Sequence, residues 1–315
     1  MRPVASDGRW VDPLSVTTEF PAIDAYVFGP YDPNPFGAQP PNAPAPARAP
    51  GRVSHLGGAL AAAIVTVGLA VAANYGATPL LIAVATAQGL LVLCWVFGIA
   101  VPGRLGAVVV GGLAAAGADV IVSRWPHGQL GTLAVVLGLA VPAMFIHQLT
   151  RGVVRTRVVE SLSDVALLVV AVVALAAFMQ LSHEMLGTQL VTAVALAAGC
   201  ALVAGHIVDM VWPVPRFDPN VRRGLLAVVV AAAIGASVTY LRLSDTVDFA
   251  SERSLYLGAS VGALVSLFAV GAAFVQYGLP RGGRISAIIR PFGGAFMSVG
   301  LVAPLAYLLC LIIRG

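Results

Sequence analysis

The stretch PLLIAVATAQGLLVLCWVFGIA, residues 79–100, decides the fold of this chain. It contains no charged side chain from end to end, and only Thr86 and Gln88 are conventionally polar. A helix rises ~1.5 Å per residue, so a run of this length can cross the ~30 Å hydrocarbon core of a bilayer. The stretch therefore predicts a transmembrane helix.

Similar apolar blocks follow one another from residue 56 to the end of the chain. Hydrophobic residues make up 59% of the sequence and charged residues 10%, whereas about a quarter of a soluble domain is charged. Turn residues such as Pro102-Gly103 separate the blocks. We predict an all-α, polytopic membrane helix bundle. Its nine expected spans are 56–75, 79–100, 104–123, 128–149, 160–182, 188–211, 223–242, 254–277 and 291–313.

The first 55 residues differ in composition and form a predicted separate region, with the transmembrane domain at 56–315. This region holds 11 of the 21 prolines, and proline removes backbone donors, so we expect a largely disordered cytoplasmic tail. Five aromatic residues interrupt it between residues 20 and 36. Spaced aromatics of this kind predict a docking segment for a protein partner. The alternative is a tail that lies across the membrane surface or across the protein's own cytoplasmic face.

The arginines predict the orientation. All 18 basic residues are Arg, and under the nine-span arrangement fourteen fall on the side of the N-terminus and four on the other side. Cytoplasmic loops carry the excess of positive charge, so the N-terminus is predicted inside and the C-terminus outside the plasma (inner) membrane. Because the arginines mark helix ends rather than one patch, the pI of 9.2 does not indicate nucleic-acid binding.

Several ionisable residues gather at the predicted cytoplasmic ends of spans four, five and six. Ionisable groups within spans are costly, so their positions are informative. We expect them to lie at similar depth and to form one polar pocket, with carboxylates and imidazoles suited to a divalent metal. The members of this cluster are His147, Arg151, Arg155, Arg157, Glu160, Asp164, His206 and Asp209.

A second set of residues is a candidate phosphate-binding group. Arginine binds phosphate through charge-assisted hydrogen bonds, and the glycines of PRGGR, residues 280–284, let backbone N–H groups approach an anion. The members are Arg222, Arg223, Arg281 and Arg284. The plainer interpretation is that the arginines only set topology, that Glu160 and Asp164 complement a helix dipole, and that His206 and Asp209 satisfy each other.

Other features predict packing. Gly258 and Gly262 form a GxxxG motif, which is typical of close helix contacts in membranes. Asp119 is the deepest acid, either a proton or substrate site or an interfacial pair with Arg124 or a neighbouring helix. Gln88 is an expected interhelical hydrogen bonder.

Three functions are compatible with these patterns. No catalytic or nucleotide-binding motif is present, and we assign no catalytic residue, cofactor or metal. We favour a non-enzymatic component of a membrane assembly that recruits a partner through residues 20–36. The alternatives are a lipid-phosphate or polyprenyl-phosphate enzyme or flippase that uses the cytoplasmic Arg/acid cluster, and a small-solute transporter.

Overall fold

A computed structural model describes residues 52–126, 130–151, 158–218, 221–246, 248–277 and 284–314, with the backbone alone of Arg52, Tyr277 and Arg284. The predicted docking segment, residues 20–36, lies outside these ranges, as do Arg155, Arg157 and Arg281. The described chain is helical apart from one short hairpin and the turns.

Nine helical spans in the described residues are long and apolar enough to cross a membrane, which confirms the predicted bundle. α6 and α7 together make one of these spans. The helices are α2 (Arg52–Asn74), α3 (Ala77–Gly98), α4 (Arg104–Arg124), α5 (Gly131–Thr150), α6 (Val158–Leu175), α7 (Ala177–Ser182), α8 (Gly187–Val211), α9 (Leu225–Leu243), α10 (Ser251–Tyr277) and α11 (Arg284–Arg314).

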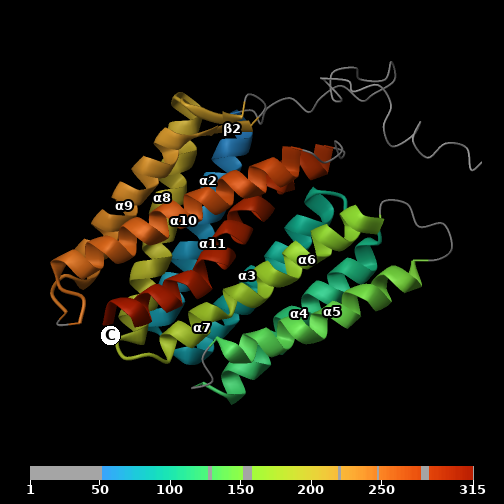
Figure 1. Cartoon of the computed structure of the whole chain (residues 1–315), viewed down its shortest axis with the longest axis horizontal. Coiled ribbons are helices and arrows are strands. Elements are labelled where there is room, and N and C mark those ends of the chain that lie inside the picture. Colours follow the sequence, from blue (N-terminus) through green and yellow to red (C-terminus); the bar gives the residue numbers. More distant parts are fainter. Residues whose placement is uncertain are drawn as a thin grey trace, which may run out of the picture. The chain divides into compact units, whose positions relative to one another are not determined.

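Helix α11 is the centre of the bundle. It packs against α2, α8 and α10 on one side and against α3, α6 and α7 on the other (Figure 1). Helix α9 packs outside α8 and α10, and α5 packs outside α4 and α6. The described helices thus form two groups, and α11 packs against both.

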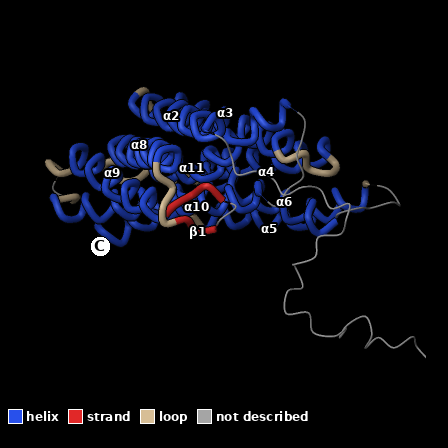
Figure 2. Tube along the Cα trace, turned by 90° about the horizontal axis from the view of Figure 1, so that it is seen from above, coloured by secondary structure: helices blue, strands red, loops and turns tan. Residues whose placement is uncertain are grey.

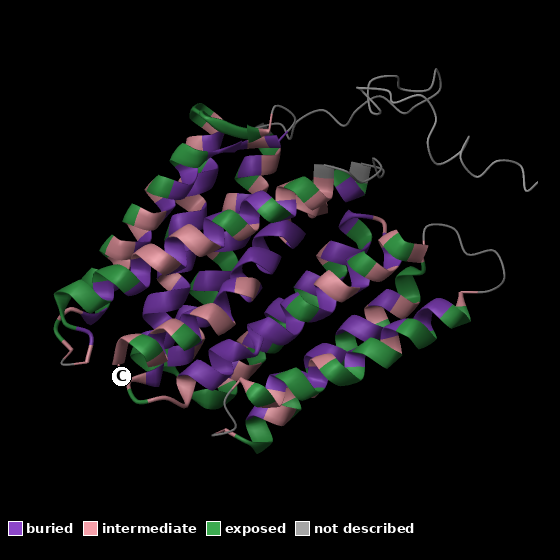
Figure 3. Ribbon diagram, viewed as in Figure 1, coloured by how far each residue is buried: buried purple, intermediate pink, exposed green. Residues whose placement is uncertain are grey.

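Burial follows this arrangement. The α6–α7 span and α8 are the most buried, whereas α5 and α9 bury the least (Figure 3). Large apolar side chains point outward from the peripheral helices, for example Leu139 on α5 and Leu241 on α9, which are 68% and 78% exposed. In a bilayer, lipid tails can cover such apolar side chains. The backbone of each helix needs no partner from the lipid, because its N–H and C=O groups are hydrogen-bonded within the helix.

Small residues allow close contact between α9 and α10. A Cβ added at Gly258 or Gly262 would meet the backbone carbonyl oxygens of Gly235 and Ala231, respectively. Thr239 also donates to the carbonyl oxygen of Ser254, at 2.6 Å. The GxxxG prediction is therefore confirmed, because only residues without a side chain let the two backbones approach this closely.

A short hairpin joins α8 to α9, where we expected an irregular proline-rich break. Strand β1 (Arg216–Asp218) pairs antiparallel with β2 (Val221–Gly224), after a cis peptide bond between Val214 and Pro215 (Figure 2). Strand β2 contacts α8, α9 and α10. The hairpin therefore places Arg222 and Arg223 of β2 at the end of the bundle.

Helix α11 begins at Arg284, seven residues before the expected start at 291. Its extra turns are tied to the end of α3, because Ser286 Oγ and Arg290 Nε both donate to the carbonyl oxygen of Gly98. That carbonyl belongs to the last turn of α3, where helical acceptors lack an internal partner. We call this end of the bundle, which carries Arg104, Arg151, Arg222 and Arg223, the arginine-rich end.

Candidate functional site

The predicted polar cluster falls into two groups at the arginine-rich end. One group belongs to α8 and β2 and contains His206, Asp209, Arg222 and Arg223. The other belongs to α5 and α6 and contains His147, Arg151, Glu160 and Asp164. Helix α8 packs on α2, α9 and α10, whereas α5 packs on α4 and α6. The structure does not bring the two groups into one pocket.

The first group is a buried network around Arg223. Its Nη1 donates to Asp209 Oδ2 at 2.9 Å, and the backbone N–H of Gly224 donates to Asp209 Oδ1 at 2.9 Å. Both side chains are buried, Asp209 completely. Burial lowers the pKa of Arg223, and the adjacent Asp209 carboxylate opposes that shift. Arginine nevertheless stays charged in proteins, so the network contains a buried ion pair.

The position of Arg223 determines which ring nitrogen carries the proton in two histidines. Its Nη2 lies 3.3 Å from His206 Nε2, and arginine has donors only, so Nε2 must accept. The neutral ring of His206 then carries its proton on Nδ1, which lies 3.5 Å from His55 Nδ1. That contact makes His55 Nδ1 the acceptor, and the proton of His55 stands on Nε2.

His55 is a functional candidate that the sequence analysis missed. The ring is 3% exposed, and its Nε2 is buried without a hydrogen-bond partner. It lies near the start of α2, and Gly58, one turn later, leaves the space that the His206 ring occupies. A His three residues before a glycine on an apolar helix was the only available signal, and it is a weak one.

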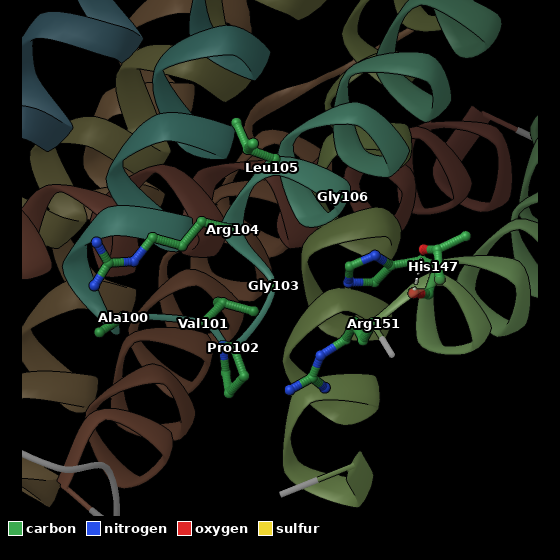
Figure 4. A pocket seen from close by; sticks show the side chains of 10 residues that line it. Ala100, Val101, Pro102, Gly103, Arg104, Leu105, Gly106, His147 and Arg151 are labelled. Carbon is green, nitrogen blue, oxygen red and sulfur yellow. Dashed lines mark hydrogen bonds between the residues drawn. The ribbon is translucent and has the colours of Figure 1, made fainter. Parts of the chain in front are cut away.

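Two members of the second group, His147 and Arg151, border a hollow of about 790 Å³ at the start of α4 (Figure 4). The chain enters α4 through Ala100 and Gly103, which have φ angles of 57° and 76°. The first helical bond runs from the N–H of Ala107 to the carbonyl oxygen of Gly103. The N–H groups of residues 104, 105 and 106 therefore come before the first hydrogen bond within α4. The positive end of the helix dipole lies at these groups.

His147 and Arg151 reach this turn from α5 (Figure 4). The His147 ring packs on Gly103 and Gly106, where any side chain would collide with it. It is 5% exposed, and its Nε2 has no hydrogen-bond partner. Arg104 completes the lining, with its guanidinium 5.9 Å from the centre of the Phe97 ring.

A hydrogen-bonded chain holds Arg151 in place. Its Nη1 donates to Gln148 Oε1 at 2.8 Å, and Gln148 Nε2 donates to Ser161 Oγ at 3.1 Å. Ser161 in turn donates to the carbonyl oxygen of Pro102 at 3.1 Å. This chain connects α5, α6 and the turn before α4, so the walls of the hollow are fixed relative to one another.

Glu160 and Asp164 lie in the first turns of α6 but do not line the hollow. Asp164 is buried, and its backbone carbonyl accepts a hydrogen bond from the indole N–H of Trp95 at 3.1 Å. The described residues contain no group of three or more His, Cys, Asp or Glu side chains that could hold a metal ion. The predicted residues of the described chain thus do not assemble a metal site.

No protein-family model matches this sequence, and comparisons with curated proteins and with solved structures found no match.

The hollow has the chemistry of an anion site. Free N–H groups at a helix start attract negative charge, and the two arginines add charge-assisted donors. A neutral His147 can add one further donor if its proton stands on Nε2. Of the predicted phosphate group, Arg222 is half-buried and its Nε is buried without a hydrogen-bond partner, while Arg223 is already paired with Asp209.

Proposed function

We propose that this membrane protein binds the phosphate group of an anionic lipid in the hollow beside the first turn of α4. The observation that carries the proposal is that His147, Arg151 and Arg104 line one hollow together with the start of α4, where three backbone N–H groups precede the first helical hydrogen bond. A phosphate oxygen can accept from several of these donors at once.

The surroundings of the hollow favour a lipid over a free ion. Leu105, in its lining, is 84% exposed, and Ile146 and Leu149 on α5 are 59% and 62% exposed. In a bilayer these side chains meet acyl chains at the level where the headgroups begin. An amphiphile can therefore place its phosphate among the donors and its chains along the apolar surface of α4 and α5.

This function corresponds to the lipid-phosphate alternative of the sequence analysis. The favoured alternative there, recruitment of a partner through residues 20–36, concerns residues outside the described ranges and stays a prediction. The function proposed here is recognition of the phosphate group. From the arginine bias we expect the site to face the cytoplasmic leaflet.

The test is lipid binding to the full-length protein, measured by native mass spectrometry. Wild type, Arg104→Ala and Arg124→Ala are titrated with phosphatidic acid, with zwitterionic phosphatidylcholine and with inorganic phosphate. Arg124 is the matched control, because it is an exposed arginine at the other end of the same helix. A hydrogen bond to a charged group contributes about 1.5–3 kcal/mol, so Arg104→Ala should weaken phosphatidic acid binding by at least tenfold.

Three results would contradict the proposal. Equal affinity for phosphatidic acid and phosphatidylcholine would show that the phosphate charge is not recognised. Equal loss in Arg104→Ala and Arg124→Ala would show general attraction of anionic lipid rather than a site. Binding of inorganic phosphate as tight as that of the lipid would assign the hollow to a soluble anion.

A further inference from the structure

The α6–α7 span is interrupted deep in the bundle, beside two polar side chains. Helix α6 ends at Leu175 and α7 begins at Ala177. The N–H of Ala176 donates to the carbonyl oxygen of Val173 instead of that of Val172, at 3.1 Å. The carbonyl oxygen of Val172 accepts instead from Gln88 Nε2, at 2.9 Å. The side chain of Gln88 thus replaces a helical hydrogen bond.

The same amide nitrogen also binds Asp119. Gln88 Nε2 lies 3.1 Å from Asp119 Oδ1, so its two hydrogens go to a backbone carbonyl and to a carboxyl oxygen. The reverse orientation of the amide would face its oxygen toward the carbonyl oxygen of Val172. The hydrogen-bond network therefore fixes this orientation.

This orientation leaves an acceptor without a donor. Gln88 is 1% exposed, and its Oε1 is buried with no hydrogen-bond partner. Gln88 lies near the middle of α3, and Asp119 lies five residues before the end of α4, about 7.5 Å along the helix axis. Asp119 is half-buried, whereas the Gln88 oxygen is fully buried and is not reached by bulk water.

A proton on Asp119 supplies the missing donor. A neutral carboxylic acid and a primary amide form two complementary hydrogen bonds: the amide N–H donates to the acid carbonyl, and the acid O–H donates to the amide carbonyl. The first of these bonds is already present. The ionised form keeps a charge at membrane depth, where a carboxylate is costly.

We propose that Asp119 and Gln88, at the interruption between α6 and α7, form an intramembrane site that binds and releases a proton. The site is separate from the hollow at the start of α4. This proposal favours the third function considered from the sequence, a small-solute transporter. In transporters, ionisable residues within the membrane and interrupted helices commonly form the sites that bind protons or other ions.

Among the described residues, few charged groups lie on the elements that pack around Asp119. Four elements pack against α4: α3, α5, α6 and α7. Helices α3 and α7 carry no charged residue, and Cys94 is the titratable group of α3. The titratable groups of α5 and α6 are His147, Glu160 and Asp164, all at the arginine-rich end. On α4 itself, Arg124 is exposed, and Arg104 lies at the opposite end from Asp119.

The test is infrared spectroscopy of the full-length protein in lipid, as the difference between spectra at low and high pH. A protonated carboxylic acid has a C=O stretch that a carboxylate lacks, so the wild type should show a band that disappears as pH rises. Asp119→Asn should lack this band completely. Asp164→Asn removes another buried carboxyl and should keep it.

Gln88→Leu keeps Asp119 and removes its partner, and provides a second measurement. Loss of the hydrogen bonds to the acid should move the C=O band to higher frequency without abolishing it. Absence of a titrating carboxylic acid band from the wild type would overturn the proposal. So would a band that persists in Asp119→Asn, or one that Gln88→Leu leaves at the wild-type frequency.

Discussion

The guanidinium of Arg223 lies 2.9 Å from the carboxylate of Asp209, and the pair joins the hairpin to α8. Asp209 also accepts from the backbone N–H of Gly224, so the carboxylate fixes both the arginine and the start of α9. A buried ion pair gains little over an apolar pair of the same size, but removing one partner leaves an unpaired buried charge.

We therefore predict strong coupling between these two residues. Arg223→Met and Asp209→Leu should each lower the free energy of unfolding by about 3–5 kcal/mol, and the double variant should lose less than the sum. The measurement is denaturant-induced unfolding in mixed micelles. Glu184→Gln is the control, because its pair with Arg314 is longer, at 3.7 Å, and partly exposed. Strict additivity of the two single losses would contradict the coupling.

The histidine tautomers are a second prediction. Because Arg223 donates to His206 Nε2, His206 should be protonated on Nδ1 and His55 on Nε2. ¹⁵N NMR of histidine-labelled protein distinguishes the two ring nitrogens, and single His→Gln variants assign the signals. Arg223→Met should release His206 into a mixture of tautomers. A His206 ring protonated only on Nε2 in the wild type would contradict the assigned direction of the chain.

Two glycines of α10 provide a matched pair for packing. A Cβ at Gly262 would collide with the backbone of α9, whereas a Cβ at Gly271 meets nothing within 4 Å. Gly262→Ala should lower the free energy of unfolding by about 1–3 kcal/mol, because the helices must separate. Gly271→Ala should be neutral or stabilise by up to about 1 kcal/mol, since alanine favours the helix. Unfolding measurements that rank the two variants equally would show that α9 and α10 do not meet at Gly262.

The orientation predicted from the arginines can be tested with thiol reagents. Asp245→Cys, in the turn after α9, should react with a membrane-impermeant maleimide added to intact cells. Phe217→Cys, in β1, should react only after the membrane is permeabilised. The native cysteines lie within spans and provide the background. The reverse pattern of labelling would place the arginine-rich end outside.

The helices were predictable because each span is a long apolar block. The start of α4 at Arg104 and the end of α8 at Val211 agree with the sequence because Pro102-Gly103 and Pro213 mark these boundaries. The interruption at Ala176 has no such mark, since the surrounding residues are helix-forming leucine and alanine. The helix is interrupted there because Gln88 donates a hydrogen bond to the carbonyl oxygen of Val172. These two residues are 84 positions apart in the sequence.

The site residues were predictable in kind but not in grouping. Spacing along one helix identified His206 with Asp209 and His147 with Arg151, because side chains three or four residues apart share a face. Which helices pack against one another depends on the position of α11 in the bundle. No local sequence pattern predicts that position. His55 and Arg104 were therefore assigned no binding role, and His147 was grouped with a histidine on the other side of α11.

The most direct test of the proposed lipid site is the distance between a bound lipid phosphorus and the first turn of α4. ³¹P–¹⁵N dipolar dephasing in solid-state NMR measures it on full-length protein with ¹⁵N-labelled glycine and histidine, reconstituted with phosphatidic acid. We predict that the phosphorus lies about 4 Å from the backbone nitrogen of Gly106 and from the His147 ring, as hydrogen-bonded phosphate oxygens require. Dephasing confined to other sites, with none at Gly106 or His147, would contradict the account.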